Sequence, residues 1–412
     1  MMKVIFAFLL MLSMVATSGA VVTREWIRFY DTEEPGHNTL RRLARDPAGN
    51  IYMVGESPRF YGVDIVKYSP TGAVLWSRYY STNSTSDRIN AVQVDSLGNL
   101  YLVGYMHPGS ASPDVLVLKY SPAGTMVWRR IVDLSGSVDS AEAAVIGSNG
   151  GITLVAKIGS STDLMLMSYR PDGVLSWQKR VEVGAPQHSA FFMFTDQNKN
   201  IVTVTTPVWS PYIERLWAHK CDSVGDPVWT KVYSPPGQEL RCNEAKMDAE
   251  GGVVFVGYIE EIYQPNKAVL GRLSPSGEVS WQVTYAASSS FDSWGMALAI
   301  DPSGNAFAFC RISKPENSFG TALLKVSRNG SLLWSRELPQ ERLALDGAET
   351  DSDGNVYAIG GQFMGDHWSL ATAKYLGDGE QAWIDNYSDD NNGTSGSREL
   401  LVQLNGDVYV GG

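Results

Sequence analysis

The sequence has 412 residues, of which 33 are Lys or Arg and 44 are Asp or Glu, so the formal net charge is −11. This acidic balance argues against a protein that binds nucleic acid or an anionic membrane surface. A hydrophobic fraction of 44% excludes a disordered chain, and the 40 glycines, 12 tryptophans and 19 tyrosines indicate many turns and aromatic-rich strands.

The first 20 residues have the pattern of a secretory signal peptide. Lys3 gives a basic start, residues 4–16 form an apolar run interrupted only by Ser13, and residues 18–20 are small. The run is too short to span a bilayer, and no later segment resembles a transmembrane helix. We therefore expect a signal peptide over residues 1–20, one domain over residues 21–412, and a secreted protein, either extracellular or periplasmic.

A repeat of about 51 residues runs through the rest of the chain. Each unit has an Asp-x-x-Gly-Asn turn or a weaker copy of it, and most have a Lys-Tyr-Ser-Pro-x-Gly turn or a drifted copy that ends four residues before a tryptophan. The repeat tryptophans are Trp26, Trp76, Trp128, Trp177, Trp229, Trp281, Trp334 and Trp383. Self-similarity at this period indicates a repeat architecture.

Each unit is predicted to contain four short strands joined by tight turns. In the second unit the strands are residues 88–94, 100–104, 114–120 and 125–131. Asp favours the first turn because its carboxylate accepts backbone N–H bonds, and Gly favours the left-handed position of the turn. A four-stranded unit at this period is typical of a β-propeller blade, so the sequence predicts an all-β propeller.

The ends of the chain decide the number of blades. Residues 25–30 read as a lone fourth strand, and residues 398–404 and 408–411 read as the first two strands of an eighth unit. Seven closed blades would leave three orphan strands with an unpaired edge. We therefore expect eight blades, the last shared by strands from both ends and lacking its third strand, with seven blades as the alternative.

The repeat resembles a known family. Residues 46–55 with 67–76, and residues 95–104 with 119–128, resemble the bacterial SBBP β-propeller repeat. This resemblance implies a secreted or surface-exposed propeller, usually without an assigned activity. A weaker resemblance to quinoprotein-like propeller repeats is partial, because the Ala-x-Asp and Thr-Gly elements of that repeat are mostly absent.

Two sets of repeated side chains have alternative interpretations. The repeat tryptophans could form a carbohydrate-stacking surface, but their recurrence at one position per unit favours packing between blades. Five lysines could form a basic ring, but we expect solvated strand residues that lie over aromatic rings. These lysines are Lys67, Lys119, Lys220, Lys325 and Lys374.

A candidate ligand site lies at the mouth of the predicted channel. The first strand of each blade lines this channel, and the position five residues before its turn is polar or charged in six of eight units. These rim residues are Arg41, Asn90, Glu142, Asn243, Asp346 and Arg398. A convergent polar rim is where a ligand would bind, and a hydrated rim without a ligand is the alternative.

One loop has the spacing of a calcium site. In residues 388–399, oxygen-bearing side chains fall at positions 1, 3, 5 and 12 with Gly at position 6, as in an EF-hand loop except that Ser stands first. The predicted ligands are Asp390, Asn392 and Glu399, and an ordinary inter-blade loop is the alternative.

Cysteine and histidine offer little further chemistry. The five histidines are scattered, which argues against a zinc site, and three cysteines cannot build a disulfide framework. We expect no bridge between Cys221 and Cys242, because their strand ends would face opposite sides of the disc.

Two classes of function fit this sequence. The first is a monomeric, non-enzymatic scaffold that binds a protein or a polysaccharide on one face of the disc. The alternative is a propeller enzyme, either a quinoprotein-like oxidoreductase or a polysaccharide-active hydrolase or lyase. An enzyme usually breaks repeat symmetry with a longer loop that carries its catalytic groups, whereas these units differ by only a few residues. We therefore favour binding, and predict no catalytic residues and no cofactor besides calcium.

Overall fold

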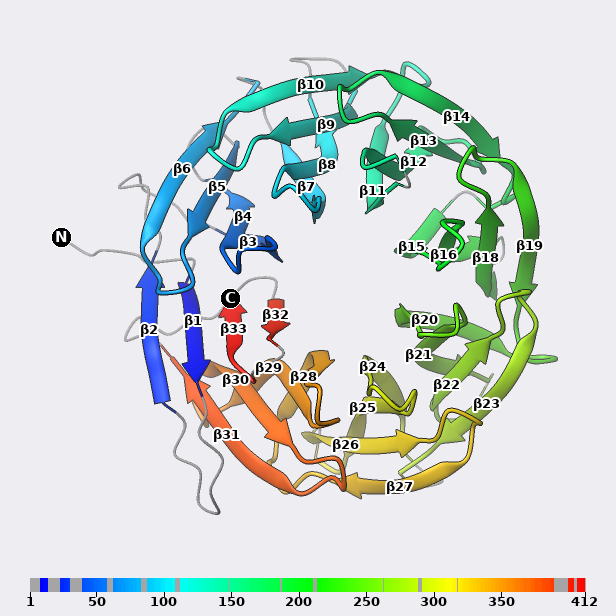
Figure 1. Ribbon diagram of the computed structural model, residues 1–412. Helices are drawn as coiled ribbons and strands as arrows, with labels where there is room; N and C mark the ends of the chain where they lie inside the picture. Colours follow the sequence, from blue (N-terminus) through cyan, green and yellow to red (C-terminus); the bar gives the residue numbers. More distant parts are fainter. Residues whose placement is uncertain are drawn as a thin grey trace.

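The computed structural model describes residues 8–13, 23–29, 39–57, 62–82, 87–107, 112–147, 149–185, 187–209, 213–261, 263–287, 291–316, 318–388, 399–403 and 406–411. Their strands form sheets that stand side by side in a ring (Figure 1). The first strand of each unit lies nearest the centre and the fourth lies at the perimeter, and we letter these positions a to d. Within the described ranges, no helix has the length and apolar character that a membrane span requires.

Seven blades are each built from one continuous segment of the chain. Blade one contains β3 (Thr39–Arg45), β4 (Ile51–Glu56), β5 (Val63–Tyr68) and β6 (Val74–Tyr80). Blade two contains β7 (Arg88–Val94), β8 (Leu100–Met106), β9 (Asp114–Tyr120) and β10 (Met126–Val132). Blade three contains β11 (Asp139–Ile146), β12 (Ile152–Ile158), β13 (Leu164–Tyr169) and β14 (Leu175–Val181). The four strands expected in the second unit are therefore confirmed.

The other continuous blades repeat this order with small variations. Blade four contains β15 (Gln187–Thr195), β16 (Ile201–Trp209), β18 (Leu216–Cys221) and β19 (Pro227–Tyr233), with the short β17 (Ile213–Glu214) paired to β16. Blade five contains β20 (Glu239–Met247), β21 (Val253–Glu260), β22 (Lys267–Leu273) and β23 (Val279–Tyr285). Blade six contains β24 (Ser293–Ile300), β25 (Ala306–Lys314), β26 (Ser318–Val326) and β27 (Leu332–Glu337). Blade seven contains β28 (Leu343–Thr350), β29 (Val356–Phe363), β30 (Trp368–Tyr375) and β31 (Gln381–Tyr387).

A further four-stranded sheet combines the two ends of the chain between blades seven and one (Figure 1). Its order is β2 (Thr23–Phe29), β1 (Phe8–Ser13), β33 (Val408–Gly411) and β32 (Glu399–Val402). The expected sharing of one sheet by the N-terminal and C-terminal strands is observed. The third position, which we expected to be vacant, is taken by β1, which pairs antiparallel with both β2 and β33. Residues 8–13 belong to the predicted signal peptide, and a short apolar run suits either role.

In five blades the first turn owes its shape to a buried aspartate. In blade one, Asp46 Oδ1 accepts bonds from the backbone N–H groups of Ala48 at 3.0 Å and Asn50 at 2.9 Å, and its other oxygen accepts from Asn50 Nδ2 at 2.8 Å. Gly49 has a φ of +84°, a left-handed conformation that costs a residue with a Cβ. The same set of bonds recurs at Asp95, Asp196, Asp301 and Asp351.

Lys67, Lys119 and Lys220 are buried, and Lys325 and Lys374 are half-buried, so the expectation that these lysines are solvated is wrong. Lys67 is 4% exposed, and its Nζ lies 2.8 Å from Asp46 Oδ2 and 4.7 Å from the centre of the Tyr52 ring. Burial opposes ionisation of Asp46, but bonds from Asn50 and Lys67 hold the pKa of this carboxyl below its usual value. The expected position over an aromatic ring is confirmed, and the turn aspartate supplies the charge partner that allows a lysine to be buried.

Tryptophans join neighbouring blades, as expected from their spacing. Trp128 is 8% exposed, and its Nε1–H donates to Pro171 O of blade three at 2.9 Å. Its ring covers Gly173, where an added Cβ would lie 2.8 Å from the indole. Equivalent bonds run from Trp76, Trp177, Trp229 and Trp281 to the next blade. The repeat tryptophans described in this way are therefore structural.

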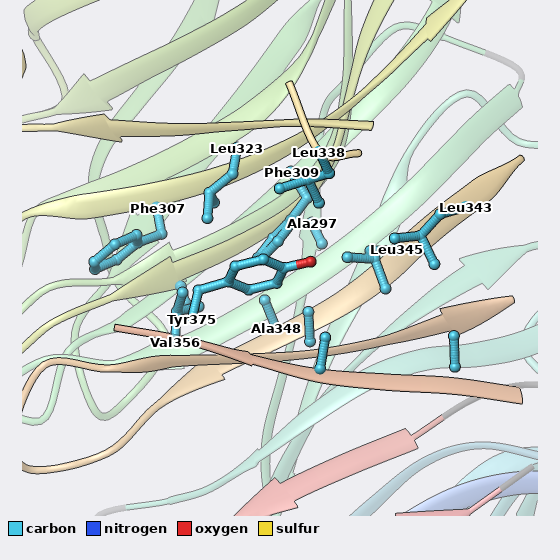
Figure 2. Close-up of a cluster of buried hydrophobic side chains, with 14 residues drawn as sticks. Ala297, Phe307, Phe309, Leu323, Leu338, Leu343, Leu345, Ala348, Val356 and Tyr375 are labelled. Atoms are coloured by element: carbon cyan, nitrogen blue, oxygen red, sulfur yellow. The ribbon is translucent and has the colours of Figure 1, made fainter. Parts of the chain in front are cut away.

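Apolar clusters fill the spaces between blades. Figure 2 shows the cluster between blades six and seven, in which Phe307, Phe309 and Leu323 of one blade face Leu345 and Tyr375 of the other. Leu338 and Leu343 belong to the same cluster and flank the link between the two blades. This core fixes the geometry of that link.

The cysteines lie in separate clusters. Cys221 packs between blades three and four, whereas Cys242 packs between blades four and five, so the sheet of blade four separates them. Both thiols are buried and free, as is Cys310. Burial raises the pKa of Cys221 to about 12, so this thiol is unreactive at neutral pH.

Candidate functional site

The two faces of the disc carry different connections. Because neighbouring strands are antiparallel, the tight a–b and c–d turns lie on one face, which we call the turn face. The b–c connections and the links from strand d to the next strand a lie on the opposite face, which we call the loop face. The repeat constrains the turn face strongly, so variable chemistry is concentrated on the loop face.

The predicted rim residues lie on β-bulges of strand a. In blade one the register shifts between Leu40 and Arg42, and in blade two between Ile89 and Ala91, so Arg41 and Asn90 are the extra residues. The opposing Gly104 has no room for a side chain, since an added Cβ would lie 1.9 Å from Arg88 O. The glycine that ends the first motif of the repeat is explained by this bulge.

The rim side chains are spread around the ring and engage nearby groups. Arg41 Nη2 lies 2.7 Å from Glu56 Oε1, and Lys157 Nζ lies 3.1 Å from Glu142 Oε1. Amide groups connect blades: Asn90 Nδ2 donates to Ala141 O and Asn243 Nδ2 donates to Gly295 O, each at 2.8 Å. Asp346 is exposed, and Arg398 lies outside the described residues. The structure assigns contacts to these positions, and a ligand at the rim stays a prediction.

A network of charged side chains connects strands a near the centre of the ring, at positions that, apart from Glu399, the sequence analysis did not select. Glu399 Oε1 lies 3.1 Å from Arg42 Nη1, and Glu349 accepts the Val402 N–H at 2.8 Å. Glu244 accepts the backbone N–H of blade six at Leu298 at 2.6 Å. We call Arg42, Glu244, Lys246, Glu349 and Glu399 the central network.

Lys246 reaches across blade six. Its Nζ donates to Ala348 O of blade seven at 2.6 Å and lies 3.4 Å from Glu244 Oε1. The equivalent positions of the blade in between carry only Ala297 and Ala299. At the positions of the central network, the other units carry mostly apolar residues. A charged residue at such a position is the sequence signal that identifies the network.

The central network makes stability depend on pH. Burial raises the pKa of Glu399 to about 7, with Glu349 and Glu244 adding to the shift and Arg42 opposing it. Burial also raises the pKa values of Glu244 and Glu349, opposed in both cases by Lys246. These carboxyls bind protons more tightly in the folded protein than in the unfolded chain.

We therefore expect the free energy of unfolding to fall as the pH rises from about 4.5 to about 7, because the folded state holds the extra proton in this range. Glu399→Gln should flatten this dependence and should stabilise the protein most above pH 7. Urea unfolding at several pH values checks this, with Glu182→Gln, at an exposed position, as a control that should keep the wild-type slope. A Glu399→Gln profile parallel to that of the wild type would contradict the shift.

The predicted calcium ligands are only partly described. Asp390 and Asn392 lie outside the described residues, and the Glu399 carboxylate belongs to the central network. A different acidic group forms at the edge of blades two and three, where carboxylate oxygens of Asp114, Asp133 and Asp139 lie within 4.8 Å of one another. The carboxylate of Asp139 already accepts hydrogen bonds, at Oδ2 from Leu134 N–H at 2.6 Å and at Oδ1 from Gly159 N–H at 2.9 Å. The calcium site stays a prediction.

The loop face has a pocket between blades six and seven with a volume of about 530 Å³, within the usual range for small-ligand sites. We call it the aromatic pocket. It is lined by Lys314, Pro315, Glu316, Ser318, Glu341, Arg342, Phe363 and Gly365. Three connections build it: the β25–β26 hairpin, the link between β27 and β28, and the β29–β30 loop.

Aromatic rings and guanidinium groups continue from this pocket onto the surface. Trp368 is 38% exposed, stacks on Phe319 at 6.0 Å with an interplanar angle of 13°, and meets Phe363 edge-on at 5.7 Å. The Arg311 guanidinium lies 4.2 Å from the Phe319 ring centre, and that of Arg342 lies 5.1 Å from the Phe363 ring centre. Sequence reasoning missed this group, although Trp368 stands outside the repeat positions.

The backbone holds the aromatic pocket in a defined shape. Arg342 N–H donates to Phe319 O at 3.0 Å, and Phe363 N–H donates to Arg342 O at 3.1 Å, so this link is bonded on both sides. Two of the four described non-glycine residues with positive φ, Glu316 at 61° and Arg342 at 51°, line this pocket. Backbone conformations of this kind occur preferentially at functional sites.

Comparison with known sequences supports the repeat assignment. A sequence model of the SBBP β-propeller repeat matches residues 75–105. These residues form an SBBP β-propeller repeat. The matched segment begins in β6 and ends in β8, so the SBBP repeat is offset from the structural blade by one strand. A search of curated proteins finds no match to the chain.

Several solved structures resemble this chain. The WD40 domain of SCAP from fission yeast has a TM-score of 0.51 and 9% identity, over 91% of this chain and 92% of that one. An ulvan lyase has a TM-score of 0.47 and 12% identity, over 85% and 93% of the two chains. A periplasmic gluconolactonase from Pseudomonas aeruginosa has a TM-score of 0.48 and 14% identity, over 80% and 96%. The likeness to the WD40 domain, at 9% identity, indicates a common fold alone.

Proposed function

We propose that this chain is a secreted, non-enzymatic binding scaffold, extracellular or periplasmic, that recognises a polymer or a protein with its loop face. The observation that carries the proposal is the aromatic pocket, which Phe363 and Arg342 line and beside which the exposed Trp368 contacts Phe363. An aromatic side chain held rigidly at the surface gives contact area at a small cost in conformational entropy.

The ring would serve as the rigid support of this face. We propose that it has eight blades, the eighth being the sheet shared by the two ends of the chain. This arrangement supports the proposal because Arg28 of β2 donates from Nε to Gly72 O of blade one at 2.7 Å, as Arg78 of β6 does to Gly124 O of blade two. The N-terminal strand thus makes the contact that other fourth strands make with the following blade.

The proposal is tested with the secreted form of the chain on arrays of proteins and polysaccharides. We expect Trp368→Ala to reduce binding to the best ligand at least about tenfold, as loss of a central aromatic contact commonly does. Tyr263→Ala is the matched control, because Tyr263 is 99% exposed on the loop face, in blade five. Equal loss with both variants, or no loss with Trp368→Ala, would contradict binding at the aromatic pocket.

A further inference from the structure

The charges at the aromatic pocket are of both signs. Arg342 and Lys314 line it together with Glu316 and Glu341, and Arg311 lies beside it. Within the described part of the chain, none of these five groups has an ion-pair partner, although oppositely charged groups line the same cavity. Most surface charges near an opposite charge would pair. Because these five groups do not, the cavity offers a ligand both hydrogen-bond donors and hydrogen-bond acceptors.

This arrangement discriminates among ligand classes. A polyanion would meet the arginines favourably but would also bring its charge against Glu316 and Glu341, and a polycation would meet Arg342 and Lys314. A neutral ligand that both donates and accepts hydrogen bonds satisfies both sets. Hydroxyl groups have this property, since each is a donor and an acceptor.

The aromatic rings add the second requirement. The exposed part of Trp368 and the ring of Phe363 offer apolar faces beside polar groups. A ligand that complements them has a flat apolar face and a polar edge. A pyranose ring combines C–H groups on its face with hydroxyls at its edge.

On these grounds we propose that the aromatic pocket binds a pyranose unit of a neutral polysaccharide. The sugar face lies against the exposed part of the Trp368 ring, its hydroxyls donate to the carboxylates of Glu316 and Glu341, and its oxygens accept from Arg342. This inference rests on the proposed function, because it names the ligand class of the same pocket.

The experiment measures binding of the secreted form of the chain to neutral polysaccharides by affinity electrophoresis and calorimetry. The probes are glucan, mannan, xylan, galactan and fully methyl-esterified polygalacturonan, with unesterified polygalacturonate as the charged counterpart of the last. We expect at least one neutral polymer to bind, with an affinity that changes less than about twofold between 0.05 and 0.5 M NaCl, because screening affects exposed ionic contacts only.

Two variants at the aromatic pocket separate the ligand classes. Glu341→Gln and Arg342→Asn should each weaken binding of the neutral polymer about fivefold or more, and Asn tolerates the positive φ at position 342. The controls Glu278→Gln and Arg170→Gln remove exposed charges of the turn face and should change nothing.

A polyanion ligand would give the opposite result for one variant: Glu341→Gln would strengthen binding, and salt would abolish it. That outcome, or binding only to a protein partner, would overturn the inference of a neutral sugar ligand. The proposed function would still hold in either case if binding depended on Trp368. Absence of binding to every neutral polymer would also overturn the inference.

Discussion

Replacing Trp128 with alanine is expected to lower the free energy of unfolding by about 3–5 kcal/mol, the usual cost of removing a large buried aromatic side chain. The indole is 8% exposed and packs edge-on against Tyr101 at 5.9 Å. It also donates to the turn of the next blade at Pro171 O. The loss therefore affects two blades, and thermal and urea unfolding measure it.

Two further variants test this explanation. Trp128→Phe keeps most of the ring but loses the bond to Pro171, so it should cost less than the alanine variant. Trp368→Ala removes a tryptophan of the loop face that is 38% exposed, and should change stability far less. If Trp128→Ala melted like the wild type but no longer bound its ligand, the structural role of the repeat tryptophans would be wrong.

The parts of the fold that depend on the repeat were predictable from sequence. Trp128 and Asp95 recur at fixed offsets in every well-preserved unit, so their spacing alone indicates turns, strands and blades. Lys67 recurs equally well, but sequence does not show that Asp46 approaches it within 2.8 Å, so its burial was missed. A lysine and an aspartate that both recur in the same unit could have suggested this ion pair.

The candidate site was less predictable, because it depends on departures from the repeat. Phe319, Phe363 and Trp368 come from strand ends and loops of two blades, and only the ring geometry brings them together. Glu244 and Glu349 were missed for the same reason. The rim positions were selected by counting along an ideal strand, but the bulge at Arg41 makes that count uncertain by one residue.

Deleting residues 21–31 is the second change with a large expected effect, because it removes β2 from the sheet that closes the ring. Ile27 of β2 packs against the cluster that contains Trp383, Leu400 and Val410, and Arg28 bonds to blade one. Loss of one apolar side chain and one hydrogen bond at this junction should cost about 3–5 kcal/mol.

The deletion should also promote association. When the predicted signal peptide is removed, β1 is absent and this sheet holds three strands where the others hold four or five, which makes it the weakest point of the ring. Loss of β1 removes the described partner of β33, and β2 is then the remaining N-terminal strand that can cover this edge. Removing β2 as well leaves the edge open to strands of other molecules.

Light scattering and thermal melting of chains 21–412 and 32–412 test this closure, and Arg28→Ala serves as an intermediate. We expect 32–412 to melt at a lower temperature and to associate as its concentration rises, while Arg28→Ala stays monomeric and loses only about 1 kcal/mol. A chain 32–412 that melts like 21–412 and stays monomeric would show that blades one and seven hold the ring without β2.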